Sequence, residues 1–298
     1  MTGPIESVPS GGTWSSRWGL RWGLVRGLVR ASHPIPTVVV TGLSAGLAAL
    51  AHDRLGSAVL VVLAVFAGQL SIGWSNDRID AVRDRAVRRE DKPLASGAIT
   101  ARAVGVAAGI ALVAAIGLAA ALGYRAGSAA LVIVGCGWAY NLGLKATRWS
   151  WLPYALAFGT LPAVATLARA DPRWPAAWAL AAGAALGVAA HFANVLPDLL
   201  ADAATGVRGL PHRLGAHASV VLGPVLLLAA SGCVIFGGAA DGFSGGARAA
   251  GFGGAALVAA VAIGAGWRHP SSRVFFLATL VVAVADLALF GLSGGRLS

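Results

Sequence analysis

Three aspartates follow an apolar run in the stretch SIGWSNDRIDAVRD. Asp77, Asp80 and Asp84 are spaced at i, i+3 and i+7, so in a helix they share one face. Carboxylates are costly beside lipid, and three on one face repel one another unless cations hold them. The spacing therefore indicates a metal site at a helix end. Ion pairs of Asp80 with Arg83 and of Asp84 with Arg88 on a solvated face are the simpler alternative.

A second acidic cluster lies in the stretch HFANVLPDLLADAATGVRG. Asn194, Asp198 and Asp202 are spaced at i, i+4 and i+8, and Gly206 is placed to end their helix. The presence of two such clusters favours the metal interpretation over the ion-pair one. Asp and Asn oxygens without nearby His or Cys favour a hard cation such as Mg²⁺, which commonly binds one or two carboxylates together with substrate phosphates.

Basic side chains occur in the same loops as the acidic clusters. A metal ion and basic side chains on one face of a membrane cavity predict a diphosphate site. The other end of such a ligand should be apolar. The basic residues are Arg78, Arg88, Arg89 and Lys92 in the first loop, Lys145 and Arg148 between the clusters, and Arg208 and Arg213 in the last.

The composition is that of an integral membrane protein, with 57% hydrophobic residues, 12% charged residues and a mean hydropathy of +0.75. The net charge of +11 could suggest nucleic acid, but in a membrane protein a basic excess usually reports orientation. We therefore expect no nucleic-acid partner. The richness in Ala, Gly and Arg, with almost no Lys, favours a bacterial source, so we expect a multi-pass protein of the bacterial inner (cell) membrane.

We predict an all-α integral membrane fold with nine transmembrane helices, because apolar segments of about 20 residues recur along the chain. With the N-terminus in the cytoplasm, 17 of the 23 Lys and Arg residues fall on the cytoplasmic side, as the positive-inside rule requires. Four crossings separate the two acidic clusters, so both open on that side and could face each other across a cavity. The segments are residues 35–52, 56–75, 102–122, 127–145, 151–169, 174–196, 217–237, 249–267 and 273–293.

Residues 1–30 form a basic, Trp-rich segment ahead of the membrane domain, which we place at residues 31–298. Trp14, Trp18 and Trp22 are four residues apart, so in a helix their indoles lie along one stripe. This favours an interfacial helix on the cytoplasmic leaflet. A disordered basic tail is the alternative, because three glycines weaken the helix.

Several motifs resemble those of the UbiA superfamily of intramembrane prenyltransferases. NDRIDAVRD reads as the family's first Asp-rich motif, NDxxDxxxD, and NVLPDLLAD followed by GVRGLPHRLG resembles the second. DKPLASGAI is similar to the segment that follows the first motif, and YNLGLK, from Tyr140 to Lys145, to the family's tyrosine-to-lysine signature. The resemblance spans about residues 30 to 293. The chain departs from the pattern in having Asn194 where some members have Asp, and Gly209 where a Thr is commoner.

The resemblance implies nine helices around a central cavity, with two Mg²⁺ ions bridging the diphosphate of a prenyl diphosphate. It implies catalytic roles for Asp77 and Asp198, and for Lys145 near the diphosphate. The implied ligands of one metal are Asn76, Asp77, Asp80 and Asp84, and those of the other are Asp198 and Asp202 with Asn194 in the same motif. The implied diphosphate-binding residues are Arg88, Lys92, Tyr140, Lys145, Arg148 and Arg208.

The resemblance also implies a reaction, the transfer of a prenyl group to a small aromatic or quinone-precursor acceptor through an allylic carbocation. A terpene cyclase of the same family is the alternative, since it shares the ionisation step. A cation- or proton-coupled transporter is less favoured, because it predicts acids near the bilayer midplane on broken helices. The sequence does not specify acceptor, prenyl length or oligomeric state.

Two further titratable residues lie inside predicted membrane segments. His191 is seven residues before Asp198, so it lies on nearly the same helical face and could position the acceptor. A core histidine bonded to a backbone carbonyl is an equal alternative. Asp286 is isolated in the last segment, where an intramembrane carboxylate indicates either function or a hydrogen bond to a neighbouring helix.

Overall fold

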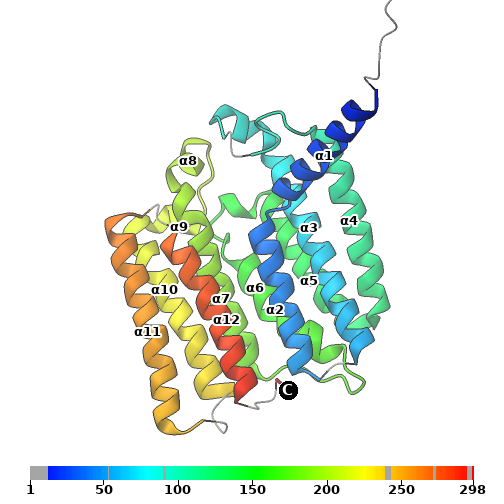
Figure 1. The fold of residues 1–298 in the computed structure, drawn as a ribbon. Helices are drawn as coiled ribbons and strands as arrows, with labels where there is room; N and C mark the ends of the chain where they lie inside the picture. The colour runs from blue at the N-terminus through cyan, green and yellow to red at the C-terminus, as the bar shows by residue number, and fades with distance from the viewer. Residues whose placement is uncertain (1–12, 53, 90–91, 239–242, 271–272, 294–296) are drawn as a thin grey trace, which may run out of the picture.

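The computed structural model describes residues 13–52, 54–89, 92–238, 243–270, 273–293 and 297–298, with side chains from Trp22 onward. These residues form helices, turns and loops, and the described part of the chain contains no strand. The helices stand side by side as a bundle (Figure 1). Their bounds are α1 Thr13–Ala31, α2 Pro34–Leu50, α3 Leu55–Ala86, α4 Ala101–Ala121, α5 Gly123–Leu142, α6 Leu152–Leu167, α7 Ala177–Val195, α8 Leu199–Ala204, α9 Leu210–Leu214, α10 Ala216–Cys233, α11 Gly245–Arg268 and α12 Val274–Leu292.

Each predicted membrane segment lies on a helix of the bundle, in the order α2 to α7 and then α10 to α12. By length and composition, six described helices can cross a membrane: α3, α4, α7 with α8, α10 with its last turn, α11 and α12. The bent pair α1 and α2 makes a seventh if it is counted as one span, and α6 is shorter, with 16 residues. The chain is therefore a multi-pass membrane protein.

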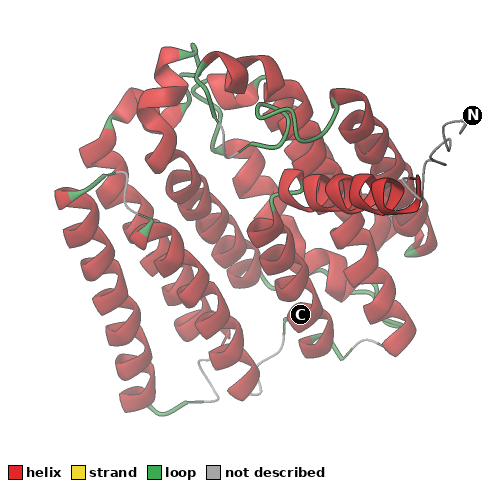
Figure 2. Ribbon diagram, turned by 45° about the horizontal axis from the view of Figure 1, so that its top comes forward, coloured by secondary structure: helices red, strands yellow, loops and turns green. Residues whose placement is uncertain are grey.

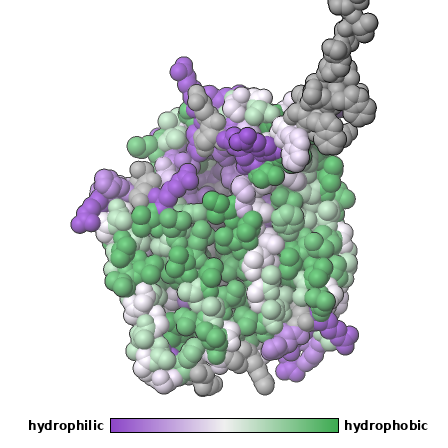
Figure 3. All heavy atoms as spheres, in the orientation of Figure 1, coloured by the Kyte–Doolittle hydropathy of each residue, from purple (hydrophilic) through white to green (hydrophobic). Residues whose placement is uncertain are grey.

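Apolar side chains cover the middle of the bundle and polar ones gather at its two ends. Figure 3 shows this as a band of hydrophobic residues between two hydrophilic regions. The upper hydrophilic region in this view surrounds α1, α8 and α9 (Figure 1). A band of this kind is what the hydrocarbon core of a bilayer requires, because charged side chains there are costly.

Two helices carry the acidic clusters beyond the apolar band. α3 has 32 residues, and its last three turns contain Asn76, Asp77, Asp80 and Asp84. α7 ends at Val195, where Pro197 lies in the following 3₁₀ turn, Leu196–Asp198. A proline cannot donate to the α-helical ladder, so the second cluster is divided among α7, the 3₁₀ turn and α8. The uninterrupted α-helix implied by its i, i+4, i+8 spacing does not form, although residues 177–204 still count as one span by length and composition.

The chain bends by 67° between α1 and α2. Figure 2, turned from the view of Figure 1, shows α1 lying across the end of the bundle. The Trp74 indole of α3 donates a hydrogen bond to the Leu28 carbonyl of α1 at 2.9 Å, and Gly27 packs against Ile99. His33 stands at the bend with a left-handed backbone, φ 53°.

Glycines allow α6 and α7 to approach each other closely. A Cβ on Gly183 would lie 2.3 Å from the Phe158 carbonyl oxygen, and one on Gly187 would lie 2.3 Å from that of Tyr154. Small residues at helix contacts are a general device of membrane bundles. Here they fix the spacing of two helices that also line the cavities described below.

We expect Gly183→Ala to lower the free energy of unfolding by about 1–3 kcal/mol, because the added methyl group forces α6 and α7 apart. Gly109→Ala is the matched control, since nothing lies within 4 Å of a Cβ at that position on α4. Thermal unfolding of the two purified variants in detergent measures the difference. Equal stability of the two variants would contradict the close approach of α6 and α7.

Candidate functional site

Two adjoining cavities lie at the polar end of the bundle. The polar cavity, of about 350 Å³, is lined by both acidic clusters and by basic side chains. The apolar cavity, of about 210 Å³, lies between α2, α3, α5, α6, α7 and α12. Six residues line both cavities: His33, Pro36, Asn76, Tyr140, Asn194 and Phe276. The two cavities therefore meet at these six residues.

The α3 wall of the polar cavity consists of Asn76, Asp80, Arg83 and Asp84. The Asn76 amide donates to Asp80 Oδ2 at 3.2 Å and to Asn141 Oδ1 at 3.0 Å. Asp80 accepts a hydrogen bond from Arg83 at 3.0 Å and another from the Lys145 ammonium. Asp80 is thus held by cations from two different segments of the chain.

Asp77 is not among the described residues that line the polar cavity. It is 1% exposed, and its Oδ1 lies 2.7 Å from Lys92 Nζ and 3.0 Å from His33 Nε2. Its Oδ2 is buried without a hydrogen-bond partner. The i, i+3, i+7 spacing predicts that Asp77, Asp80 and Asp84 share the face of the site. In the structure, the face of α3 that lines the cavity carries Asn76, Asp80 and Asp84. The difference is one residue, or about 100° around the helix.

The opposite wall carries the second acidic cluster. Asn194, Asp198 and Asp202 line the polar cavity despite the break at Pro197. Arg89 donates to Asp198 Oδ1 at 3.2 Å, and the Arg83 guanidinium lies 3.8 Å from Asp202 Oδ1. Arg83 therefore links the two acidic clusters across the cavity. This agrees with the prediction that the clusters face each other.

The predicted diphosphate-binding residues divide into two groups. Tyr140, Lys145 and Lys92 line the polar cavity. Arg88, Arg148 and Arg208 are exposed side chains and are not among the described residues that line it. Burial lowers the pKa of Lys145 below the ordinary lysine value, and the Asp80 carboxylate beside it acts in the opposite direction. The additional basic residues of the lining are Arg30, Arg83, Arg89 and Arg273.

The oxygen donors of the cavity suit a hard cation. Asn76, Asp80 and Asp84 face Asp198 and Asp202, and carboxylate and amide oxygens are the ligands that Mg²⁺ prefers. In the described part of the chain, no three His, Cys, Asp or Glu side chains converge closely enough to hold an ion as the side chains stand. Arg83, Arg89 and Lys145 lie between them and balance their charge.

His191 lies at the wall of the polar cavity and is 1% exposed. Its Nε2 lies 3.0 Å from the Ser150 hydroxyl, which accepts a hydrogen bond from the Leu210 amide at 2.8 Å. Its Nδ1 is buried without a partner. The expected hydrogen bond to a backbone carbonyl is therefore absent for Nε2, which is bonded to Ser150. The position of His191 beside the cavity agrees with the alternative, in which it positions the acceptor.

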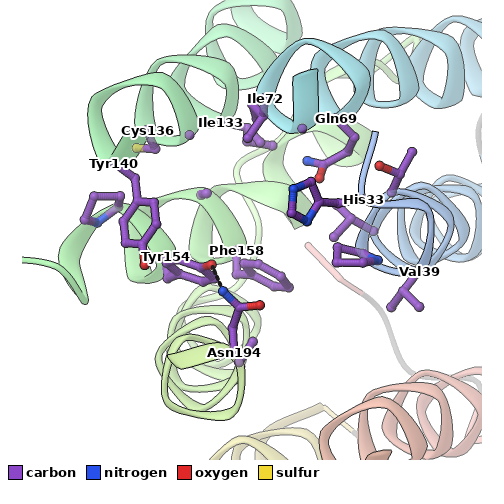
Figure 4. Close-up of a pocket in the computed structure, with 18 of the residues that line it drawn as sticks. His33, Val39, Gln69, Ile72, Ile133, Cys136, Tyr140, Tyr154, Phe158 and Asn194 are labelled. Atoms are coloured by element: carbon purple, nitrogen blue, oxygen red, sulfur yellow. Dashed lines mark hydrogen bonds between the residues drawn. The ribbon is translucent and has the colours of Figure 1, made fainter. Parts of the chain in front are cut away.

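Aromatic rings surround the junction of the two cavities. The ring centroid of Tyr154 lies 5.2 Å from that of Tyr140 and 5.0 Å from that of His191. The Asn194 amide donates to the Tyr154 hydroxyl at 3.4 Å. Figure 4 shows His33, Tyr140, Tyr154 and Asn194 around the apolar cavity. These rings could hold a flat molecule by edge and face contacts.

Sequence reasoning missed several residues of this region. His33, Ser150, Tyr154 and Asn141 are polar side chains that lie far along the chain from either acidic motif. The His-Pro pair at the start of α2 is one local signal, because a histidine beside a helix-starting proline stands at a defined corner. Asn141 lies within YNLGLK, next to Tyr140, whereas Ser150 and Tyr154 carry no pattern of their own.

The family model described as the UbiA prenyltransferase family matches residues 35–290. The comparison with curated proteins gives no match. The fold is similar to the apo structure of a UbiA homolog from Aeropyrum pernix K1, with 18% identity, 85% of this chain and 96% of that chain covered, and a TM-score of 0.69.

Two further structures share the fold. A UbiA homolog from Archaeoglobus fulgidus bound to GPP and Mg²⁺ has 14% identity, covers 89% of this chain and 99% of its own, and has a TM-score of 0.62. A structure concerned with digeranylgeranylglyceryl phosphate synthase has 15% identity, covers 91% and 98%, and has a TM-score of 0.64.

We expect Asp77→Ala to lower the free energy of unfolding by about 3 kcal/mol, because it removes a buried carboxylate that accepts from the partly buried Lys92 and from His33. Asp198→Ala should cost at most about 1 kcal/mol, since the side chain is 42% exposed. Chemical unfolding of both variants in detergent compares them. A larger loss for Asp198→Ala would show that Asp77 does not hold this corner.

Proposed function

Because this chain belongs to the UbiA prenyltransferase family, we propose that it transfers a prenyl group from a prenyl diphosphate to a small aromatic or quinone-precursor acceptor within the membrane. One observation carries the proposal. A cavity lined by acids and bases adjoins an apolar cavity, and six residues line both. A molecule with a charged diphosphate head and a hydrocarbon tail matches this sequence of environments.

The acidic residues of the polar cavity would hold two Mg²⁺ ions. Asn76, Asp80 and Asp84 would bind one, and Asp198 and Asp202 with Asn194 nearby would bind the other. When bound, the ions would neutralise negative charge on the departing diphosphate. The structure of the Archaeoglobus fulgidus homolog bound to GPP and Mg²⁺ supports Mg²⁺ as the metal. Asp77 holds Lys92 and His33 in place, which is a different role from the metal binding expected from the motif.

Basic residues would hold the diphosphate while the bond between the allylic carbon and its oxygen breaks. Lys145, Lys92 and Arg89 line the cavity and can exchange their carboxylate partners for phosphate oxygens. The bonding electron pair leaves with the diphosphate, and the positive charge remains on the allylic group. The apolar cavity excludes water, which would otherwise capture the cation.

The acceptor would lie at the junction, among Tyr140, Tyr154 and His191. An electron-rich ring carbon forms the new bond to the allylic carbon, and the ring proton then leaves to a base or to the diphosphate. His191 is a positioning candidate, because Ser150 fixes one ring nitrogen and the other has no partner. Three aromatic rings around one junction favour an aromatic acceptor over an aliphatic one.

The topology completes the proposal. Nine helices cross the bacterial inner membrane, with the N-terminus and the polar cavity on the cytoplasmic side, as the distribution of Lys and Arg favours. α1 lies at the interface, where its exposed Trp22, Val25 and Val29 contact lipid. A diphosphate made in the cytoplasm then reaches the polar cavity directly.

We expect the purified protein in nanodiscs to convert a prenyl diphosphate and an aromatic acceptor into a prenylated product, detected by mass spectrometry, and EDTA to abolish this. Asp80→Asn and Asp202→Asn should each lower kcat/KM by about 10²-fold or more, because each weakens charge stabilisation in the transition state. Asp171→Asn is the matched control, since Asp171 is exposed and pairs with Arg173 away from the cavities.

Other outcomes would identify other functions. A cyclic hydrocarbon or alcohol formed without acceptor would establish a terpene cyclase. Ion-dependent flux in liposomes without turnover of any diphosphate would establish a transporter. Failure of a broad panel of prenyl diphosphates to bind or react would overturn the proposal.

A further inference from the structure

A third cavity, which we call the far cavity, lies beyond the apolar cavity, toward the other end of the bundle. Its volume is about 90 Å³, and its lining includes Trp178, Leu161, Phe290 and Asp286. Four residues line both cavities, and we call them the neck: Leu43, Phe158, Leu186 and Ala283. The polar, apolar and far cavities therefore follow one another through the bundle.

The helices give the distance from the polar end to the neck. At about 1.5 Å per residue, the neck residue Leu186 lies about 12 Å along α7 from Asn194, and Leu43 lies about 15 Å along α2 from His33. An extended peptide advances about 3.5 Å over three bonds, so an isoprene unit of four bonds advances about 4.5 Å. Three isoprene units therefore reach from the junction to the neck.

Asp286 introduces a polar group just beyond the neck. It is three residues beyond Ala283 on α12, or about 4.5 Å along the axis. Its carboxyl accepts a hydrogen bond from Ser231 of α10 at 2.9 Å, and the residue is only 8% exposed. The mechanism proposed above does not use it. A hydrocarbon chain that reached this point would pack against the carboxyl group without offering it a hydrogen bond, which costs free energy.

Besides Phe158 of the neck, the aromatic rings of Trp178 and Phe290 line the far cavity. The ring centroids of Trp178 and Phe290 are 5.0 Å apart. Trp178 packs against Gly237 and Gly238, which belong to a single π-helical turn, Val234–Gly238, at the end of α10. Such turns are rare and often occur at functional sites. Here the turn directly follows the segment that carries Ser231.

We propose that the neck and Asp286 limit the prenyl group to three isoprene units, and that they are specificity-determining residues of this chain. The inference rests on the proposed function. A three-unit chain fills the apolar cavity and ends at the neck. A fourth unit must displace the Phe158 ring and lie against the Asp286 carboxyl, so a longer chain binds less well.

The test compares kcat/KM for geranyl (two-unit), farnesyl (three-unit) and geranylgeranyl (four-unit) diphosphates in competition. Wild type should prefer the three-unit chain to the four-unit chain by about tenfold or more, the scale on which an apolar pocket discriminates. Asp286→Ala and Phe158→Ala should each raise the four-to-three-unit ratio by about tenfold, because they remove the carboxyl or widen the neck. Ala283→Phe should instead lower the three-to-two-unit ratio by about tenfold, because it fills the neck.

Two control variants separate chain length from stability. Asp286→Asn keeps a hydrogen-bond acceptor for Ser231, so the ratio should stay within about threefold of wild type. Phe66→Ala removes an exposed ring on α3, outside the lining of all three cavities, and should leave the ratio unchanged. A role of Asp286 in helix packing alone would lower the melting temperature of Asp286→Ala without moving the ratio, and this would overturn the proposal.

Binding without turnover keeps the two proposals distinguishable. Thermal stabilisation by farnesyl and geranylgeranyl thiolodiphosphates reports the same preference on the intact protein. Binding of these analogues without turnover of any diphosphate would overturn the proposed transfer, whereas the length preference would still be measured. Equal stabilisation of wild type by both chains, or active Asp286→Ala and Phe158→Ala variants with wild-type ratios, would overturn the length limit.

Discussion

Carboxylates buried at the polar end of α3 need cations, and this requirement organises that end of the bundle. Asp80 is paired with Arg83 on its own helix and with Lys145 from the turn after α5. Asp77 is paired with Lys92 from the loop after α3 and with His33 from the start of α2. Because removing either member of a buried pair leaves a charge uncompensated, these pairs tie segments that are distant in sequence to the end of α3.

The main helices and the acidic residues of the site could be predicted from the sequence. Each of the nine predicted membrane segments lies on a helix, because the apolar length of a segment can be read from its own residues. By length and composition, six described helices can cross a membrane, or seven if the bent pair of α1 and α2 is one span. The two acidic clusters were recognised for the same reason, since their residues are close in sequence. The UbiA family followed from these motifs and is confirmed by the family model.

The arrangement of the site depends on tertiary packing, which spacing alone does not specify. Asp77 and Asn76 are adjacent, and only the packing of α2 and the loop after α3 decides which of them faces the cavity. Pro197 was visible in the sequence, yet the Asp-xxx-Asp spacing suggested a continuous helix. His33, Ser150 and Tyr154 come from three other segments, and their contribution depends on contacts formed after the helices assemble.

The bend at His33 has a consequence for the order in which the protein assembles. His33 has a left-handed backbone, which is unfavourable for a non-glycine residue, and its side chain is bonded to Asp77, 44 residues later in the chain. Trp74, which holds α1 through the Leu28 carbonyl, is also on α3. The orientation of α1 relative to α2 therefore depends on contacts with α3, and α1 can reach its final position only after α3 has been synthesised and inserted.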